Sequence, residues 1–269
     1  PVSIAIPSTL KNIDYEGFQY ARAEIDGLPE GLLSINTSAF YGADVTDNLV
    51  IPSTVTSIGP SAFNAGPEDV HYDTITIKPN LSMNSAAGQL IHQMFWNVDV
   101  DKLIINSSEL PATNLDLGDD AEMQEFWHMP IEEVVITNLP KITVGAFDGC
   151  TNLKKADLSS DGNLRTIAAK AFIGDSKLDE IYFAPAIKNE VVTVGSFAFK
   201  GTAFKTMGDN TKQFDLSAAK FDASAGSAFA EMPLLETLDV PRTFSNLTIP
   251  VATFANDPEL RLVNIDYKL

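Results

Sequence analysis

One histidine and four glutamates near the middle of the chain have the side chains best suited to bind a metal ion. They are Glu122, Glu125, His128, Glu132 and Glu133. A histidine with two carboxylates can ligate zinc, but these residues would span a turn and a strand without a recognised ligand spacing. We therefore interpret the cluster as a solvated acidic loop and keep a metal site as the alternative.

The remaining acidic and histidine residues show still less of a metal-binding pattern. Asp116, Asp119 and Asp120 lack the alternating oxygen ligands and the terminal glutamate of a calcium loop. His71 and His92 lie far apart in the sequence and far from the acidic cluster. The sequence therefore predicts no metal ion and no other cofactor.

Residues for covalent or cofactor-dependent catalysis form no recognised motif in this sequence. A nucleophile elbow, a phosphate loop, a dinucleotide fingerprint and a zinc protease motif are all missing from the sequence. We therefore predict a protein that is not an enzyme. An enzyme of unfamiliar type is the alternative, and a deep polar pocket within residues 78–138 would favour it.

Cys150 is the only cysteine, so the chain cannot form an intrachain disulfide or a cysteine metal cluster. It lies three residues after Phe147, where a small apolar side chain can pack inside a turn. Free cysteines are among the most buried residues. We expect a buried structural thiol rather than a reactive nucleophile.

The elements that carry these residues repeat along the chain. The segments 139–158 and 164–183 align on Ala146-Phe147 and Ala171-Phe172, with apolar residues at the same offsets on both sides. Self-similarity of this kind is typical of repeat proteins. The same pattern places eight phenylalanine anchors along the chain: Phe18, Phe40, Phe63, Phe147, Phe172, Phe199, Phe229 and Phe254.

Two further copies, centred on Phe95 and Phe126, fill the long interval between Phe63 and Phe147. Anchors then recur every 21–32 residues. We predict one domain over residues 1–269 with about ten irregular coils, a possible N-terminal capping coil at 1–31, and degenerate repeats at 78–138. A repeat array is stabilised by contacts between neighbouring coils, since one coil alone cannot bury its apolar side chains.

Apolar residues recur six, nine and eleven residues after an anchor, and the last three residues of this pattern alternate inward, outward, inward, as expected for a strand with one buried face. Clear instances lie at 49–51, 156–158, 181–183, 238–240 and 263–265. Stacked in register, these strands would form a parallel sheet on one side of the molecule. The remaining side would consist of irregular, short extended or single-turn helical segments.

Charge and hydropathy exclude some classes of partner. The chain has 36 acidic and 18 basic residues, a formal net charge of −18, which repels phosphate backbones and anionic lipids. No apolar run approaches the roughly 18–20 residues that span a bilayer. We expect neither nucleic-acid binding nor a membrane-spanning segment. The sequence begins at Pro1, and we expect that a targeting segment has been removed.

Two stretches show the repeat motif most completely, IPSTVTSIGPSAFNAG at 51–66 and ITVGAFDGCTNLKKADL at 142–158. This motif resembles that of the BspA-like leucine-rich repeat family of bacterial proteins. The chain departs from it in keeping only one cysteine, in its variable spacing and in lacking Ala-Phe in the middle section. The resemblance implies a leucine-rich repeat solenoid that is secreted or displayed at a cell surface and binds host or neighbouring-cell proteins or glycans.

The outward-facing residues of the predicted sheet are the candidate binding site, because they form a broad repetitive surface on a rigid core. The candidates are Ile104, Glu133, Val135, Lys155, Asp157, Glu180, Tyr182, Thr237, Asp239 and Asn264. Taken one at a time, these residues fit ordinary solvent-facing strand positions. The apolar residues on this face, including Leu262, are nevertheless a signal for an interaction site, and a dimer contact would give the same signal. A structural or spacer role without a tight ligand is the alternative function.

Overall fold

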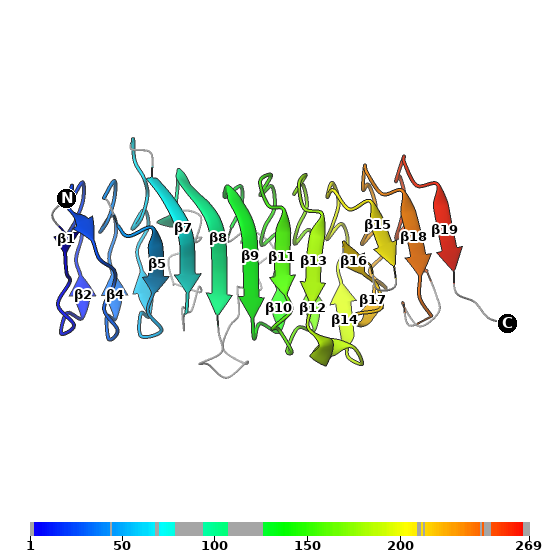
Figure 1. The fold of residues 1–269 in the computed structure, drawn as a ribbon, viewed down its shortest axis with the longest axis horizontal. Helices are drawn as coiled ribbons and strands as arrows, with labels where there is room; N and C mark the ends of the chain where they lie inside the picture. The colour runs from blue at the N-terminus through cyan, green and yellow to red at the C-terminus, as the bar shows by residue number, and fades with distance from the viewer. Residues whose placement is uncertain are drawn as a thin grey trace.

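The computed structural model describes most of the chain as one elongated stack of coils, with the N-terminus at one end and the C-terminus at the other (Figure 1). The described residues are 3–43, 45–67, 70–78, 94–106, 126–208, 211, 213–242, 244 and 249–265. Parts of the predicted degenerate repeats, 79–93 and 107–125, lie outside this set. Among the described helices, none combines the length and apolar character needed to cross a membrane.

One side of the stack is a ten-stranded sheet, as the alternating pattern predicts. Adjacent strands pair in parallel, so the parallel-sheet prediction is confirmed. The strands in chain order are β5 (Asn48–Ile51), β7 (Val70–Ile77), β8 (Val98–Asn106), β9 (Ile131–Thr137), β11 (Lys155–Leu158), β13 (Glu180–Phe183), β15 (Thr206–Gly208), β16 (Phe214–Asp215), β18 (Thr237–Val240) and β19 (Leu262–Ile265).

The opposite side consists of shorter extended segments and turns. A three-stranded sheet there comprises β2 (Asn12–Ile13), β4 (Ser34–Ile35) and β6 (Ser57–Ile58). A four-stranded sheet comprises β10 (Lys141–Ile142), β12 (Thr166–Ile167), β14 (Val191–Val194) and β17 (Lys220–Asp222). The remaining described elements are a separate two-stranded sheet of β1 (Ser3–Ile4) and β3 (Glu24–Ile25), and the 3-10 helix η1 (Pro185–Ile187).

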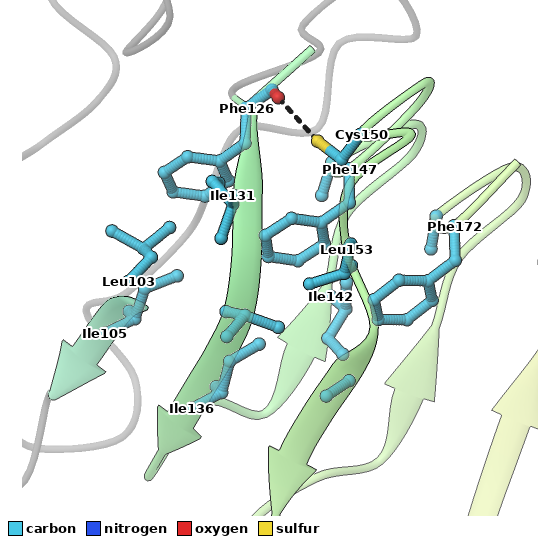
Figure 2. Packing of buried hydrophobic residues seen from close by; sticks show 14 of the residues in the cluster. Leu103, Ile105, Phe126, Ile131, Ile136, Ile142, Phe147, Cys150, Leu153 and Phe172 are labelled. Carbon is cyan, nitrogen blue, oxygen red and sulfur yellow. Dashed lines mark hydrogen bonds between the residues drawn. The ribbon is translucent and has the colours of Figure 1, made fainter. Parts of the chain in front are cut away.

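The phenylalanine anchors form the centre of the core. Rings of successive coils stack nearly parallel, with centroids 5.0–5.5 Å apart from Phe18 to Phe95 and again from Phe126 to Phe254. Figure 2 shows Phe126, Phe147 and Phe172 packed against the aliphatic residues of the strands. The inner rings are fully buried because a neighbouring coil covers each of them on both sides. The two terminal rings, Phe18 and Phe254, have an anchor ring on one side only and are partly buried.

The turn around each anchor explains why alanine precedes phenylalanine. The amide of Phe147 donates to the carbonyl of Ala171 at 2.8 Å, and the amide of Phe172 donates in turn to Ala198 at 2.8 Å. The small alanine allows this close approach of neighbouring coils. Residues two positions after an anchor, such as Asn97 and Gly149, have positive φ angles, which turn the chain back toward the sheet.

Two parts of the sheet differ from the sequence prediction. The coil after Phe199 contributes two strands, because β16 inserts between β13 and β15. In β19, Val263 and Ile265 lie in register with the buried Leu238 and Val240, as the alternating pattern predicts, but they are 47% and 42% exposed. They are not buried because no described strand lies beyond β19 to cover them.

Gly195 shows how closely the coils approach at the turns. Its amide donates to Ile167 O of the preceding coil, and a Cβ at this position would lie 2.3 Å from the backbone nitrogen of Ala169. We expect Gly195→Ala to lower the free energy of unfolding by about 1–2 kcal/mol, because a backbone neighbour cannot move aside as a side chain can. Chemical denaturation followed by circular dichroism measures this change.

Gly162 offers the matched control. A Cβ added there would make only an ordinary contact, 3.4 Å from the Cβ of Ala186. Gly162→Ala should therefore leave the free energy of unfolding nearly unchanged. Equal destabilisation by the two substitutions would contradict the steric explanation.

Candidate functional site

The outward-facing row of candidate binding residues lies in register over the middle of the sheet. Across β7, β8, β9, β11 and β13 the aligned residues are Thr76, Ile104, Val135, Asp157 and Tyr182. Beyond β13 the inserted strand interrupts the row, and Asp215 and Gly208 stand between Tyr182 and Asp239. The predicted row is therefore two separate groups of residues rather than one.

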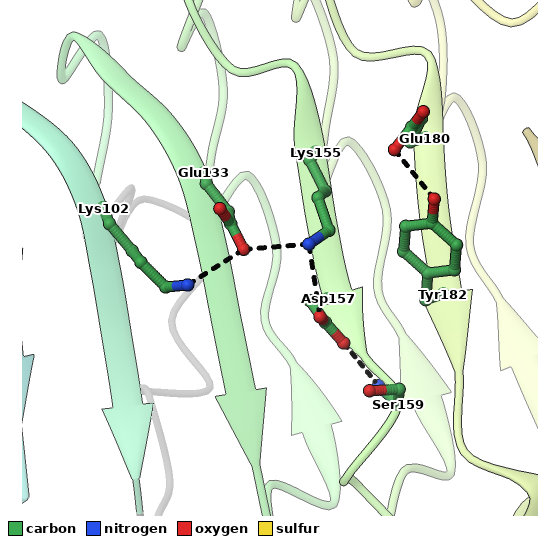
Figure 3. A network of polar contacts seen from close by, with 7 residues as sticks. All are labelled: Lys102, Glu133, Lys155, Asp157, Ser159, Glu180 and Tyr182. Atoms are coloured by element: carbon green, nitrogen blue, oxygen red, sulfur yellow. Dashed lines mark hydrogen bonds and ion pairs between the residues drawn. The ribbon is translucent and has the colours of Figure 1, made fainter.

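The first group contains a chain of charged side chains that we call the sheet-face network: Lys102, Glu133, Lys155 and Asp157. Glu133 Oε1 accepts from Lys102 Nζ at 3.1 Å and from Lys155 Nζ at 3.0 Å, and Lys155 Nζ lies 3.4 Å from Asp157 Oδ2 (Figure 3). These partners come from three successive coils. The network therefore ties β8, β9 and β11 together on the open side of the sheet.

The pKa values of the network show that its charges support each other. Partial burial alone would raise the pKa of Glu133, but hydrogen bonds from Lys155 and Lys102 lower it below its ordinary value. The hydrogen bond to Glu133 raises the pKa of Lys155. Burial likewise opposes ionisation of Asp157, whereas hydrogen bonds from Ser159 and the charge of Lys155 lower its pKa. These ion pairs stay charged at neutral pH.

Tyr182 extends this network with an aromatic side chain. Its hydroxyl donates to Glu180 Oε2 at 2.8 Å, and this hydrogen bond raises the pKa of the phenol. Lys155 Nζ lies 5.4 Å from the centre of the tyrosine ring, within the range of a cation–π contact. These two contacts set the orientation of the ring. The half-buried Ile104 and Val135 form an apolar step on β8 and β9, with Asp157 between Val135 and the tyrosine.

The second group of candidates lies near the C-terminal end of the sheet. Asp239 accepts from the side-chain amide of Asn264, and Thr237 lies in register with Thr206 and Leu262. Leu262 is 50% exposed on the last described strand. It is therefore separated from Ile104 and Val135, with which the sequence analysis had grouped it.

A hollow of about 380 Å³ lies at one rim of the sheet, outside the predicted row. It is lined by Phe95, Trp96, Asn97, Asp99, Trp127, His128, Met129 and Pro130. Trp96 is 50% exposed and Trp127 36% exposed. The sequence analysis missed this site, although both tryptophans directly follow an anchor and thus occupy equivalent positions in adjacent coils.

Of the histidine and glutamates considered as metal ligands, the described ones, His128, Glu132 and Glu133, form no ligand group. Glu132 pairs with Lys154 at 2.8 Å, and Glu133 belongs to the sheet-face network. Both are residues of strand β9, so the prediction of a solvated loop is wrong for them. His128 instead lines the hollow. Glu122 and Glu125, like the acidic residues 116, 119 and 120, lie outside the described residues.

A different group of possible ligands is formed by His71, Asp73 and Asp101. His71 Nε2 lies 3.6 Å from a carboxylate oxygen of each aspartate. All three side chains are about half exposed or more. Within the described part of the chain these are the donors that could hold a metal ion. Sequence spacing did not reveal them because Asp101 comes from the next coil.

Cys150 is fully buried, as expected for a structural thiol. Burial raises its pKa well above the ordinary value. Its sulfur donates a hydrogen bond to the carbonyl of Phe126 at 2.9 Å, as Figure 2 shows. A thiol that is both protonated and enclosed is a poor nucleophile.

Three solved structures of bacterial proteins are similar to this chain. A leucine-rich repeat protein from Bacteroides ovatus has 19% identity and a TM-score of 0.47, with 98% of this chain and 60% of that chain covered. A leucine rich cell surface protein from Faecalibacterium prausnitzii has 16% identity and a TM-score of 0.32, with 99% and 60% covered. The pneumococcal vaccine antigen PcpA has 18% identity and a TM-score of 0.38, with 100% and 69% covered.

This chain thus spans 60% of the length of the first two of these proteins. None of the curated proteins matches its sequence. The family described as BspA type leucine rich repeat region matches residues 2–108 and 119–261, in six copies. This match covers all ten anchors, every strand of the parallel sheet except β19, and the middle section apart from residues 109–118. The chain therefore belongs to the BspA type leucine-rich repeat family.

Proposed function

We propose that this chain is a non-catalytic interaction module, secreted or displayed at a cell surface, that binds a protein or glycan through the middle of its sheet. The observation that carries the proposal is the sheet-face network together with Tyr182. An aromatic ring held in place by charged neighbours loses little freedom on binding, which favours recognition. Adhesion to host or neighbouring cells is the role that the family resemblance supports.

The chemistry of the face supports binding rather than catalysis. The lysines and carboxylates of the sheet-face network neutralise each other, and Glu180 is engaged by the tyrosine hydroxyl. A partner would contact the tyrosine ring and the apolar step formed by Ile104 and Val135. Proteins of this repeat class are typically non-catalytic, in agreement with the lack of catalytic motifs in the sequence.

A structural role as a spacer or envelope component is the second candidate. The internal pairing of the charged residues favours it, because a partner would have to compete with existing ion pairs. An array of mucosal proteins and glycans distinguishes the two functions. Specific capture at micromolar concentration supports the interaction module, whereas a blank array supports the spacer.

The combined substitution Glu180→Ala and Tyr182→Ala tests the site. We expect it to weaken capture of an array ligand at least tenfold, because it removes the aromatic ring and its orienting carboxylate together. The melting temperature should remain nearly unchanged, since both side chains lie on the open side of the sheet. Surface plasmon resonance with the captured ligand measures the effect.

Tyr15→Ala is the control, because Tyr15 is 63% exposed and lies near the N-terminus, away from β11 and β13. It should bind like the wild type. If the double variant also captures the ligand with full affinity, the assignment of the site to this part of the sheet is wrong.

A further inference from the structure

The two tryptophans of this chain are placed together on its surface. The chain contains two tryptophans in all, and both line the hollow at the rim of β8 and β9. Trp96 follows the buried anchor Phe95, and Trp127 follows the buried anchor Phe126. Large aromatic side chains left half exposed in neighbouring coils are typical of a binding surface rather than of a core.

Carboxylates dominate the surroundings of this aromatic pair. Asp99 lines the hollow itself and lies in register with His71 of the neighbouring strand. Asp101 follows two residues later on the same strand, and its carboxylate and that of Asp73 both approach the His71 ring. Three exposed carboxylates therefore lie on this stretch of β7 and β8.

Two lysines of this part of the sheet are engaged by glutamates, whereas His71 lies against Asp73 and Asp101 and not against Asp99. Lys102, on the same strand as Asp99, is paired with Glu133, and Lys154 is paired with Glu132. Like charges on adjacent strands repel each other and cost stability. The hollow thus combines indole faces with a negative potential, in a protein whose net charge is already −18.

This combination selects the chemistry of a ligand. Anionic ligands are repelled. A positively charged group gains from both the indole faces and the carboxylates, because tryptophan is the strongest cation–π partner among the side chains. A guanidinium group meets both requirements, since it stacks flat on aromatic rings and donates two parallel hydrogen bonds to a carboxylate. The volume of about 380 Å³ lies in the range of ordinary ligand pockets.

We infer that the hollow between Trp96 and Trp127 binds an arginine side chain of a basic segment on a partner protein, with Asp99 as the carboxylate that receives the guanidinium. This inference rests on the proposed function, because it names the chemistry of one protein partner of the interaction module. It concerns a surface separate from the sheet-face network, so the two sites can be tested independently.

Tryptophan fluorescence reports directly on this hollow, because no tryptophan lies elsewhere in the chain. The probe is a short capped peptide with two arginines, compared with the same peptide carrying neutral citrulline. We expect a saturable change in emission with the arginine peptide and at least tenfold weaker binding of the citrulline peptide. Raising the salt concentration should weaken binding, since the contact is partly electrostatic.

Substitutions identify the groups responsible. Asp99→Asn keeps the shape of the side chain and removes its charge, so we expect about tenfold weaker binding. Trp127→Leu should weaken binding by a similar factor while Trp96 still reports by fluorescence. Glu236→Gln is the matched control, because it removes one exposed negative charge near the far end of the sheet. It should leave the affinity unchanged.

The outcomes separate this inference from the proposed function. The double variant at Glu180 and Tyr182 should bind the arginine peptide like the wild type, whatever the array shows. Equal affinity for the arginine and citrulline peptides, or equal weakening by Glu236→Gln and Asp99→Asn, would overturn the inference. It is also overturned if a neutral oligosaccharide changes the emission and displaces the peptide.

Discussion

Replacing Phe172 by alanine is expected to lower the free energy of unfolding by about 3–5 kcal/mol, the usual cost of removing a buried aromatic side chain. Phe172 is fully buried, and its ring stacks on Phe147 at 5.2 Å and on Phe199 at 5.4 Å. A cavity at this point removes contacts from the coils on both sides. A solenoid is held together by interfaces between neighbouring coils. The loss of contacts at Phe172 should therefore also uncouple the unfolding of the coils before it from the unfolding of the coils after it.

Phe18→Ala provides the comparison. Phe18 is partly buried at the N-terminal end of the described stack, where Phe40 covers it from one side at 5.4 Å. We expect a cost of about 1–2 kcal/mol, because less apolar area is lost. Urea denaturation followed by circular dichroism measures both variants. If the two substitutions cost the same, the ring stack does not provide the stability assigned to it.

The repeat pattern was sufficient to predict this core. Anchors such as Phe147 and Phe172 recur with apolar residues at fixed offsets. Residues at equal offsets in adjacent coils become neighbours in the parallel sheet. The alignment of Asp157 with Tyr182 follows from the same rule. The number of coils, the N-terminal cap at 1–31 and the binding role of the sheet face remain predictions.

The same rule fails where a coil has extra residues. Between Phe199 and Phe229 the additional length forms β16, which pairs with both β13 and β15. Offsets from an anchor cannot show whether extra residues leave the sheet as a loop or enter it as a strand. The break in the outward row before Asp239 therefore required the structure.

The contacts of the site were only partly visible in the sequence. Lys102, Glu133, Lys155 and Glu180 occupy one register position on four adjacent strands and alternate in charge. Their distances from the anchors differ, seven residues for the first two and eight for the others, so the sequence pattern alone does not align all four. The hollow was missed because His128 was considered only as a possible metal ligand, and its other lining residues were not considered together. The repeated Phe-Trp pair at two neighbouring anchors would have indicated it.

Asp175 is expected to be the residue at which substitution stabilises the protein most clearly. It lies three residues after Phe172, at the position that Cys150 and Thr202 occupy in the adjacent coils. All three side chains are fully buried, and neither carboxylate oxygen of Asp175 has a hydrogen-bond partner. Burial therefore raises its pKa well above the ordinary value, although the nearby amide of Cys150 partly opposes the shift.

The sign of the pH dependence follows from this shift. An aspartate with a raised pKa in the folded state binds its proton more tightly there than in the unfolded chain. Its favourable contribution is complete below the unfolded pKa near 3.8 and is lost as the pH rises through the folded pKa. At pH 8 the protein must either keep a charge buried or hold a proton against its tendency to dissociate.

Asp175→Thr should remove this cost and supply a satisfied polar group. In the adjacent coil, the hydroxyl of Thr202 donates to the carbonyl of Phe199 at 2.8 Å, and a threonine at position 175 can donate to Phe172 in the same way. We expect an increase of about 2–3 kcal/mol in the free energy of unfolding at pH 8, the cost of an unsatisfied buried charged group. Near pH 3.5 the increase should nearly vanish.

Urea denaturation of the variant and the wild type at matched pH values isolates this residue. Burial also raises the pKa of Asp161 and that of Asp257 to about 6, so the wild type loses stability through these groups as well when the pH rises. Their contributions are the same in both proteins and cancel in the difference. A difference that stays constant from pH 3.5 to pH 8 would show that Asp175 does not carry the buried charge, whereas a difference that grows with pH locates the cost at this one side chain.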